Sequence, residues 1–194
     1  MAYVKTPPTE ATDRRTAIAD AAIELLAEGG TRALTHRMVD KKLGIPEGST
    51  SSYHRTRAEL TRAAAERIVE GDLATLDALK PARPGEADMV EAFTAFVEGA
   101  GTPERRSRTI ARYVLYSESA NNPQVAQVIA ESRAPFVEAA AELLRLGGAE
   151  RPDESVRALG AFLIGLILTE EVMPVPMLAP DQLRESIRRF LASC

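Results

Sequence analysis

The sequence predicts an all-α protein, and three observations lead to that prediction. Apolar residues recur at helical spacing along most of the chain, as at Leu183, Ile187, Phe190 and Leu191. No segment shows the apolar–polar alternation of a half-buried strand. Aromatic residues make up only 5% of the 194 residues and Trp is absent. The core must therefore be built from Leu, Ala, Ile and Val, which favours helices.

Glycine and proline divide the chain into segments. Residues 1–12 are expected to form a disordered arm, and a helix begins at Asp13 and ends at Gly29-Gly30. A three-helix domain is expected at 13–57, and a long linking helix at 58–79 joins it to a larger helical domain within 58–194. Further helices are predicted over residues 86–98, 104–120, 124–146, 152–168 and 181–191.

The stretch from Leu34 to Leu60 has the pattern of a helix-turn-helix. Thr35 suits an N-cap, because its hydroxyl can accept hydrogen bonds from free amides of the first turn. Gly44 follows where the first helix needs a residue that tolerates positive φ. Pro46 suits the first position of a second helix over residues 46–53. That second helix is small and polar, so it is expected to contact a partner rather than fill a core.

Charge is distributed unevenly along the chain, which has a net charge of −4. Residues 1–57 carry nine Lys and Arg against seven Asp and Glu, whereas residues 58–194 carry 15 against 21. A basic N-terminal segment followed by an acidic remainder is compatible with a local contact to nucleic acid.

Residues 13–68 resemble the N-terminal domain of the TetR family of bacterial transcription regulators. The resemblance rests on the run LTHRMVDKKLGIPEGSTSSY, preceded by an apolar helix and followed by RTRAEL at the start of a long helix. It implies a homodimeric regulator that binds double-stranded DNA, with residues 46–53 as the recognition helix in the major groove. It also implies DNA contacts by His36 and Arg37, and phosphate contacts by Tyr53 and Arg57.

Three positions depart from the commonest pattern of that family. Asp40 stands where a small Ala usually packs between the two helices. Ser51 replaces the usual Tyr of the recognition helix. His54 stands where Phe usually fills the small core.

The chemistry of the second short helix indicates how it would read bases. Ser49, Thr50 and Ser52 offer hydroxyls, and Glu47 either accepts from a cytosine amino group or favours the helix N-terminus. The basic residues nearby, namely Arg55, Arg57, Lys41 and Lys42, are candidates for contacts with phosphate groups. The predicted DNA-binding residues are Thr35, His36, Arg37, Pro46, Glu47, Ser49, Thr50, Ser52, Tyr53, Arg55 and Arg57.

Nothing in the sequence indicates a metal, a cofactor or catalysis. The two histidines, His36 and His54, have no third ligand at a workable spacing, and there is no HExxH or CxxC motif. The run GSTSS is not a GxSxG nucleophile elbow on a strand. The protein is therefore not expected to be an enzyme.

The larger domain carries two further predictions. The uniformly apolar helix around Ala158–Leu168 needs covering on most sides, which favours a homodimer; the predicted interface is Leu159, Phe162, Leu163, Leu166, Ile167, Leu183, Ile187 and Phe190. A small-molecule effector is expected in an apolar pocket; its predicted lining is Phe93, Phe96, Arg112, Tyr113, Tyr116, Phe136, Phe162 and Met173.

These observations predict a TetR-like repressor released from a palindromic operator by a small-molecule ligand. Two alternatives stay open: a ligand-independent DNA-binding activator or structural protein, and a helical enzyme or adaptor. The N-terminus has no apolar leader, and the longest apolar run is far shorter than the roughly 20 residues of a membrane span. A cytoplasmic location is expected.

Overall fold

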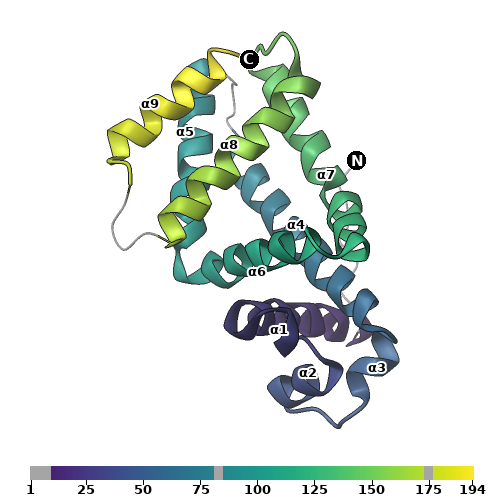
Figure 1. Ribbon diagram of the computed structural model, residues 1–194. Helices are drawn as coiled ribbons and strands as arrows, with labels where there is room; N and C mark the ends of the chain where they lie inside the picture. Colours follow the sequence, from purple (N-terminus) through teal and green to yellow (C-terminus); the bar gives the residue numbers. More distant parts are fainter. Residues whose placement is uncertain (1–9, 81–84, 173–176) are drawn as a thin grey trace. The chain divides into compact units, whose positions relative to one another are not determined.

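The computed structural model describes residues 10–80, 85–172 and 177–194, and within these ranges it contains nine α-helices and no strand (Figure 1). The predicted all-α class is confirmed. The helices are α1 Glu10–Ala33, α2 His36–Leu43, α3 Ser49–Tyr53, α4 Arg57–Leu79, α5 Glu86–Glu98, α6 Pro103–Ser119, α7 Pro123–Leu146, α8 Pro152–Val172 and α9 Pro180–Leu191. A short 3-10 turn, Gly99–Gly101, follows α5.

The first helix differs from the prediction at both ends. Residues 1–9 of the expected arm lie outside the described residues, and α1 already begins at Glu10 rather than Asp13. At the other end Gly30 has φ 67° and ψ −165°, which interrupts the regular helix, and one more turn runs on to Ala33. A positive φ is easily adopted only by glycine, so Gly30 marks the predicted break.

The chain divides into two compact units. The first extends to Ile68 and includes Ile110–Ile129; the second contains Val69–Thr109 and Ala130–Cys194. The boundaries fall inside α4, α6 and α7, so each of these helices contributes residues to both units. The predicted three-helix domain at 13–57 lies within the first unit.

The core of the first unit joins the helix-turn-helix to its supporting helices. Ile18 and Leu26 of α1 and Val39 of α2 pack in one cluster with Leu60 of α4, and all four are at most 1% exposed. The same cluster takes in Ala111, Leu115 and Val128 from the segment 110–129. Burial of this many apolar side chains holds α2 in a fixed position against α1 and α4.

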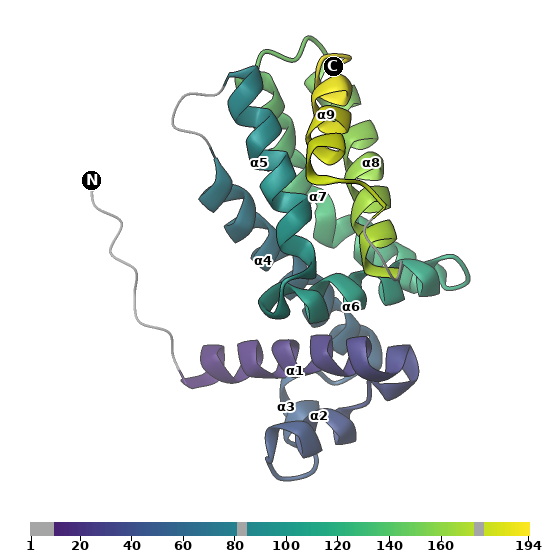
Figure 2. The ribbon, with the colours of Figure 1, turned by 90° about the vertical axis from the view of Figure 1, so that its left-hand side faces the viewer.

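The second unit is built around α5, which packs against α9 and α8 (Figures 1 and 2). Leu183 and Ile187 on α9 are buried, as are Leu159, Leu163 and Ile167 on α8. The chain's own second unit buries these five predicted interface residues, so little of their side-chain surface remains to contact a partner. The three remaining predicted residues, Phe162, Leu166 and Phe190, are partly exposed, and the Phe162 and Phe190 rings stack with their centroids 4.9 Å apart.

Part of α8 faces outward. Ala161, Gly165 and Leu168 are exposed on this helix, and Met177 is exposed shortly after it. Ala161, Phe162, Gly165 and Met177 border a hollow of about 320 Å³. Among the described residues, no helix has the length and apolar character needed to cross a membrane.

Candidate functional site

Both ends of α2 have the geometry that their residues predict. Thr35 is extended, with φ −134° and ψ 152°, and its hydroxyl accepts a hydrogen bond from the Met38 amide at 3.2 Å. Gly44 ends α2 in the left-handed region, with φ 65°. Both predicted caps of α2 are confirmed.

The helix α3 is shorter than predicted. It begins at Ser49, because residues 46–48 form a turn in which Gly48 has φ 91°, a conformation that does not continue a helix. Ser49 stabilises this turn by donating its hydroxyl to the Pro46 carbonyl at 2.6 Å. The prediction that Pro46 opens the second helix is therefore wrong by one turn.

A buried carboxylate positions α3. Asp40 on α2 is 2% exposed, and its Oδ2 accepts from the Gly48 amide at 2.7 Å. Its Oδ1 accepts from the Thr50 amide at 2.8 Å and from the Thr50 hydroxyl at 2.6 Å. Burial on its own would raise the pKa of Asp40, but these hydrogen bonds, with a smaller contribution from His36, lower it. The carboxylate thus satisfies free amides at the start of α3 from a neighbouring helix.

The position of Thr50 corrects one predicted base contact. Its side chain is fully buried and its hydroxyl donates to Asp40. Thr50 therefore has no exposed group with which to read a base, and it stabilises α3 instead.

The His36 side chain binds the backbone of His54, directly after α3. The Nε2 atom of His36 lies 2.7 Å from the His54 carbonyl oxygen, and because a carbonyl only accepts, His36 Nε2 donates. His54 is 8% exposed, and its own Nε2 is buried without a hydrogen-bond partner among the residues that the structure describes. Burial, together with the positive charge of Arg15, lowers the pKa of His54. His54 is thus a buried packing residue that is kept neutral.

The outer side of α3 is polar and is flanked by cations. Ser51 and Ser52 are exposed. The Arg15 guanidinium lies 5.6 Å from the centroid of the Tyr53 ring and donates to the Tyr53 carbonyl at 3.3 Å. The exposed Arg55 follows, with its backbone amide bound to the Glu59 carboxylate.

A further cation, Arg37, lies at the start of α2. Arg37 is 3.6 Å from Glu47 in the turn, and both side chains are more than three-quarters exposed. A pair this exposed contributes at most about 1 kcal/mol to stability, so a phosphate could replace Glu47 as the partner of Arg37. Lys42 differs, because it is only 23% exposed and pairs with Glu24 and Glu28 on α1.

Arg57 makes a contact within the first unit. Its guanidinium donates to the Thr31 carbonyl, and the Thr31 hydroxyl donates to Glu118 at 3.2 Å. Asn122 also reaches Glu118 and accepts from the first amides of α7. Arg57 therefore fixes the start of α4 in addition to being a predicted phosphate contact.

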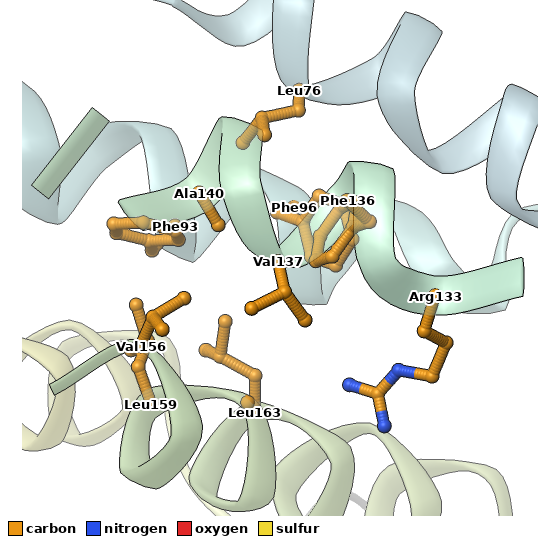
Figure 3. Close-up of a pocket in the computed structure, with 11 residues that line it drawn as sticks. Leu76, Phe93, Phe96, Arg133, Phe136, Val137, Ala140, Val156, Leu159 and Leu163 are labelled. Carbon is orange, nitrogen blue, oxygen red and sulfur yellow. The ribbon is translucent and has the colours of Figure 1, made fainter. Parts of the chain in front are cut away.

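The second unit contains a small apolar cavity of about 20 Å³ (Figure 3). Phe93 and Phe96 on α5 and Phe136 on α7 border it, as predicted, and Arg133 is the only charged residue of its lining. The remaining lining residues are Leu76, Val137, Ala140, Val156, Leu159, Gly160 and Leu163.

The other predicted pocket residues do not line this cavity. Arg112, Tyr113 and Tyr116 belong to the first unit, and Phe162 borders the separate hollow beside α8. Met173 lies outside the described residues. For Arg112, Tyr113, Tyr116 and Phe162, a role in binding a ligand stays a prediction.

Two residues of this structural description, Asp40 at the start of α3 and Arg133 at the cavity, were not among the predicted site residues. Asp40 has a signal, since Gly and Thr follow it at the eight- and ten-residue spacings of the turn, but an isolated Asp is more often solvated. Arg133 has only a weak signal, namely a charge close to Phe136 on an otherwise apolar helix face. Within the described part of the chain, no three His, Cys, Asp or Glu side chains form a group that could hold a metal ion.

Comparison with known proteins shows which family the chain resembles. A model of the family described as "Tetracyclin repressor-like, C-terminal domain" matches residues 84–193. A search of curated proteins found no match.

Three solved structures illustrate the similarity. A TetR-family member from Streptomyces coelicolor A3 is 26% identical, with TM-score 0.69 over 92% of this chain and 98% of that one. The multidrug binding protein EbrR in complex with ethidium is 27% identical, with TM-score 0.71 over 92% and 98%. A protein from Saccharomonospora viridis, described as a transcriptional regulator and solved with choline, is 17% identical, with TM-score 0.71 over 93% and 96%. Because the family model matches more than half of the chain, the protein belongs to the TetR family of transcriptional regulators.

Proposed function

We propose that the protein is a dimeric, DNA-binding repressor whose α3 enters the major groove of a palindromic operator and whose second unit binds a small-molecule effector. The single observation that carries the DNA-binding part is the fixed, outward-facing α3. Asp40 anchors its first turn, and Ser51 and Ser52 remain exposed. A rigid helix with free hydroxyls suits direct readout of base edges.

The flanks of α3 would supply most of the affinity. Arg37, Arg55 and the Arg15 beside Tyr53 surround α3 with cations suited to phosphate oxygens. Of the predicted contacts we retain Thr35, Arg37, Pro46, Ser49, Ser52, Tyr53 and Arg55. Glu47 lies at the same surface as the partner that a phosphate would replace at Arg37. His36 and Arg57 lie at the edge of the proposed DNA-binding surface. There they would hold its backbone in place through their bonds to the carbonyls of His54 and Thr31.

The dimer would form on the exposed side of α8. Ala161, Gly165 and Leu168 present an apolar surface there, and small residues allow a second helix to approach closely. Regulators of this family act as dimers, and two copies would present two α3 helices to half-sites about one helical turn apart. A protein that works on chromosomal operators would be cytoplasmic. We propose no catalytic activity and no cofactor.

Salt dependence of DNA binding tests the proposal. Binding to a mixture of genomic duplex fragments should weaken steeply as salt rises, because phosphate contacts release counterions. Arg55→Ala should reduce the slope of log affinity against log salt by about 1. Arg157→Ala, which removes an exposed charge from α8, is the matched control and should leave the slope unchanged. Absent or salt-independent binding to every fragment would overturn the DNA-binding assignment.

The effector part rests on the cavity beside Phe96 and Phe136. Two similar structures contain the small molecules choline and ethidium, which supports a ligand-responsive role here. An effector would act by binding one arrangement of the chain more tightly than the other. Since α4, α6 and α7 contribute to both units, they are the helices through which that preference would be transmitted.

A second candidate function is a DNA-binding regulator without an effector. It is favoured by the size of the cavity, because about 20 Å³ holds no more than a water molecule. Thermal denaturation against a panel of small apolar compounds separates the two functions. A rise in melting temperature with ligand concentration supports the effector-responsive repressor, whereas no rise with any compound supports the second candidate.

A further inference from the structure

The charge around the apolar cavity restricts what it can bind. Among the 11 residues that line it, Arg133 carries the only charge, and the lining includes no carboxylate. Figure 3 shows the Arg133 side chain extending from α7 toward α8 beside the cavity. A Cβ placed on Gly160 would lie 3.5 Å from its Nη2, so the guanidinium lies against α8 where that helix has no side chain.

A second arginine contributes positive charge to the same aromatic group. The Arg105 guanidinium lies 5.0 Å from the centroid of the Phe96 ring and donates to the Phe96 carbonyl at 3.2 Å. Phe96 in turn packs against Phe136, with ring centroids 6.0 Å apart. Aromatic rings often attract cations. The Phe96 ring already has the Arg105 guanidinium over it, so that face of the ring is not open to a cationic ligand.

These charges would oppose a cationic ligand and favour an anionic one. A cation in the cavity would lose its hydration, find no carboxylate among the lining residues and lie close to the Arg133 guanidinium. An anionic group could instead accept charge-assisted hydrogen bonds from Arg133, which is half-buried and thus close to solvent. The apolar part of the same molecule would replace water against Phe93, Val137 and Leu163.

The small volume implies that the ligand must widen the cavity. Pro135 lies in α7 between Arg133 and Phe136. Proline has no amide hydrogen, so α7 lacks the helical hydrogen bond that residue 135 would donate to the preceding turn. The wall of the cavity that bears Arg133 is therefore held by one backbone hydrogen bond fewer than a regular helix would have.

We propose that this cavity binds an apolar molecule bearing one anionic group, with the anion at Arg133 and the apolar part among Phe93, Phe96 and Phe136. This inference rests on the proposed effector role of the cavity. It differs in charge from the choline and ethidium found in similar structures.

Two fluorescent probes of similar shape test the inference on the full chain. The first, 8-anilino-1-naphthalenesulfonate, is anionic, and the second, N-phenyl-1-naphthylamine, is its neutral counterpart. The anionic probe should bind about tenfold more tightly than the neutral one, and ethidium should not bind in the cavity. Arg133→Met should remove the preference for the anion, while Arg133→Lys should keep part of it.

Two further variants localise the effect. Val137→Phe should weaken both probes by filling the cavity, whereas Arg157→Met removes a positive charge outside the lining and should change neither. Displacement of the anionic probe by dodecanoate or by 1-naphthoate would show whether an acyl chain or a ring system fits better; displacement by neither would overturn the inference.

The inference is overturned if ethidium binds more tightly than the sulfonate probe, or if Arg133→Met leaves the ratio of the two naphthalene affinities unchanged. It is also overturned if neither probe responds to Val137→Phe. DNA binding as a function of salt is measured separately and does not depend on the probes. A failure of the ligand inference therefore leaves the DNA-binding assignment standing, and the reverse also holds.

Discussion

The carboxylate of Asp40 on α2 accepts hydrogen bonds from both the amide and the hydroxyl of Thr50 on α3, at 2.8 and 2.6 Å. Since the same carboxylate also binds the Gly48 amide, one side chain fixes the start of a helix of only five residues. An isolated helix of this length would not be stable in water. The orientation of the proposed reading helix therefore depends on Asp40.

Replacement of Asp40 should destabilise the first unit and abolish DNA binding. Asp40→Ala removes the acceptor of the partly buried Gly48 amide and of the buried amide and hydroxyl of Thr50, which should cost about 2–3 kcal/mol of unfolding free energy. Because the folded pKa of Asp40 is lowered, its contribution is present above the ordinary value of 3.8 and is lost as pH falls through the folded pKa. Urea denaturation at pH 7 and at pH 3 measures both effects. Lys41→Ala, on the same helix and exposed, is the control and should change stability little.

Thr50 and Ser52 should respond in opposite ways. Thr50→Val keeps the shape of the side chain but leaves Asp40 with fewer donors, so it should lower stability by about 1 kcal/mol. Ser52→Ala removes an exposed hydroxyl and should leave stability unchanged while altering the selected DNA sequences. Denaturation and selection from a random duplex library measure the two outcomes. A stable Thr50→Val variant with altered sequence preference would return Thr50 to the base contacts.

His54→Phe should make the protein less sensitive to mild acid. Burial lowers the pKa of His54 below 6.5, so unfolding takes up a proton between the folded value and 6.5. The stability that depends on neutral His54 is complete above that range and is lost as pH falls through it. The Phe variant also removes the unpaired buried Nε2. Its melting temperature should exceed that of the native chain by more at pH 5.5 than at pH 8; an equal difference at both values would contradict the burial argument.

Glu47→Gln should strengthen DNA binding. The exposed Glu47 pairs with Arg37 and would repel nearby phosphates, so its neutral counterpart should raise affinity for duplex DNA several-fold at low salt. Glu66→Gln makes the same charge change at an exposed position of α4 and serves as the control. Fluorescence anisotropy at two salt concentrations measures the change. Weaker binding by Glu47→Gln would indicate that Glu47 accepts from a base instead.

Gly165→Glu should separate the proposed dimer into monomers. A Cβ at Gly165 meets no atom of the chain within 4 Å, so the substitution should not disturb an isolated subunit. In a dimer formed on this side of α8, the same side chain would place a charge in an apolar contact. Ala130→Glu, at an exposed alanine of α7, is the matched control. Sedimentation velocity distinguishes the states, and a Gly165→Glu variant that remains dimeric would place the interface elsewhere.

Periodicity and capping residues were sufficient to predict the all-α class and the ends of α2, because Thr35 and Gly44 act through their own backbone neighbourhood. Periodicity and capping residues did not identify packing partners that lie far away along the chain. An apolar stripe on α9 shows that Ile187 is covered, but it does not distinguish α5 of the same chain from a second copy. Likewise, a threonine on a polar helix suggests exposure, and only the distant Asp40 reveals why Thr50 is buried.

The anchoring of α3 from outside has an evolutionary consequence. No hydrogen bond that fixes this helix comes from the side chain of Ser51 or Ser52 among the contacts of the described chain. Substitutions at these two positions can therefore accumulate without unfolding the subunit. A lineage that keeps Asp40, Gly48 and Thr50 could drift from one operator to another while its stability remains constant.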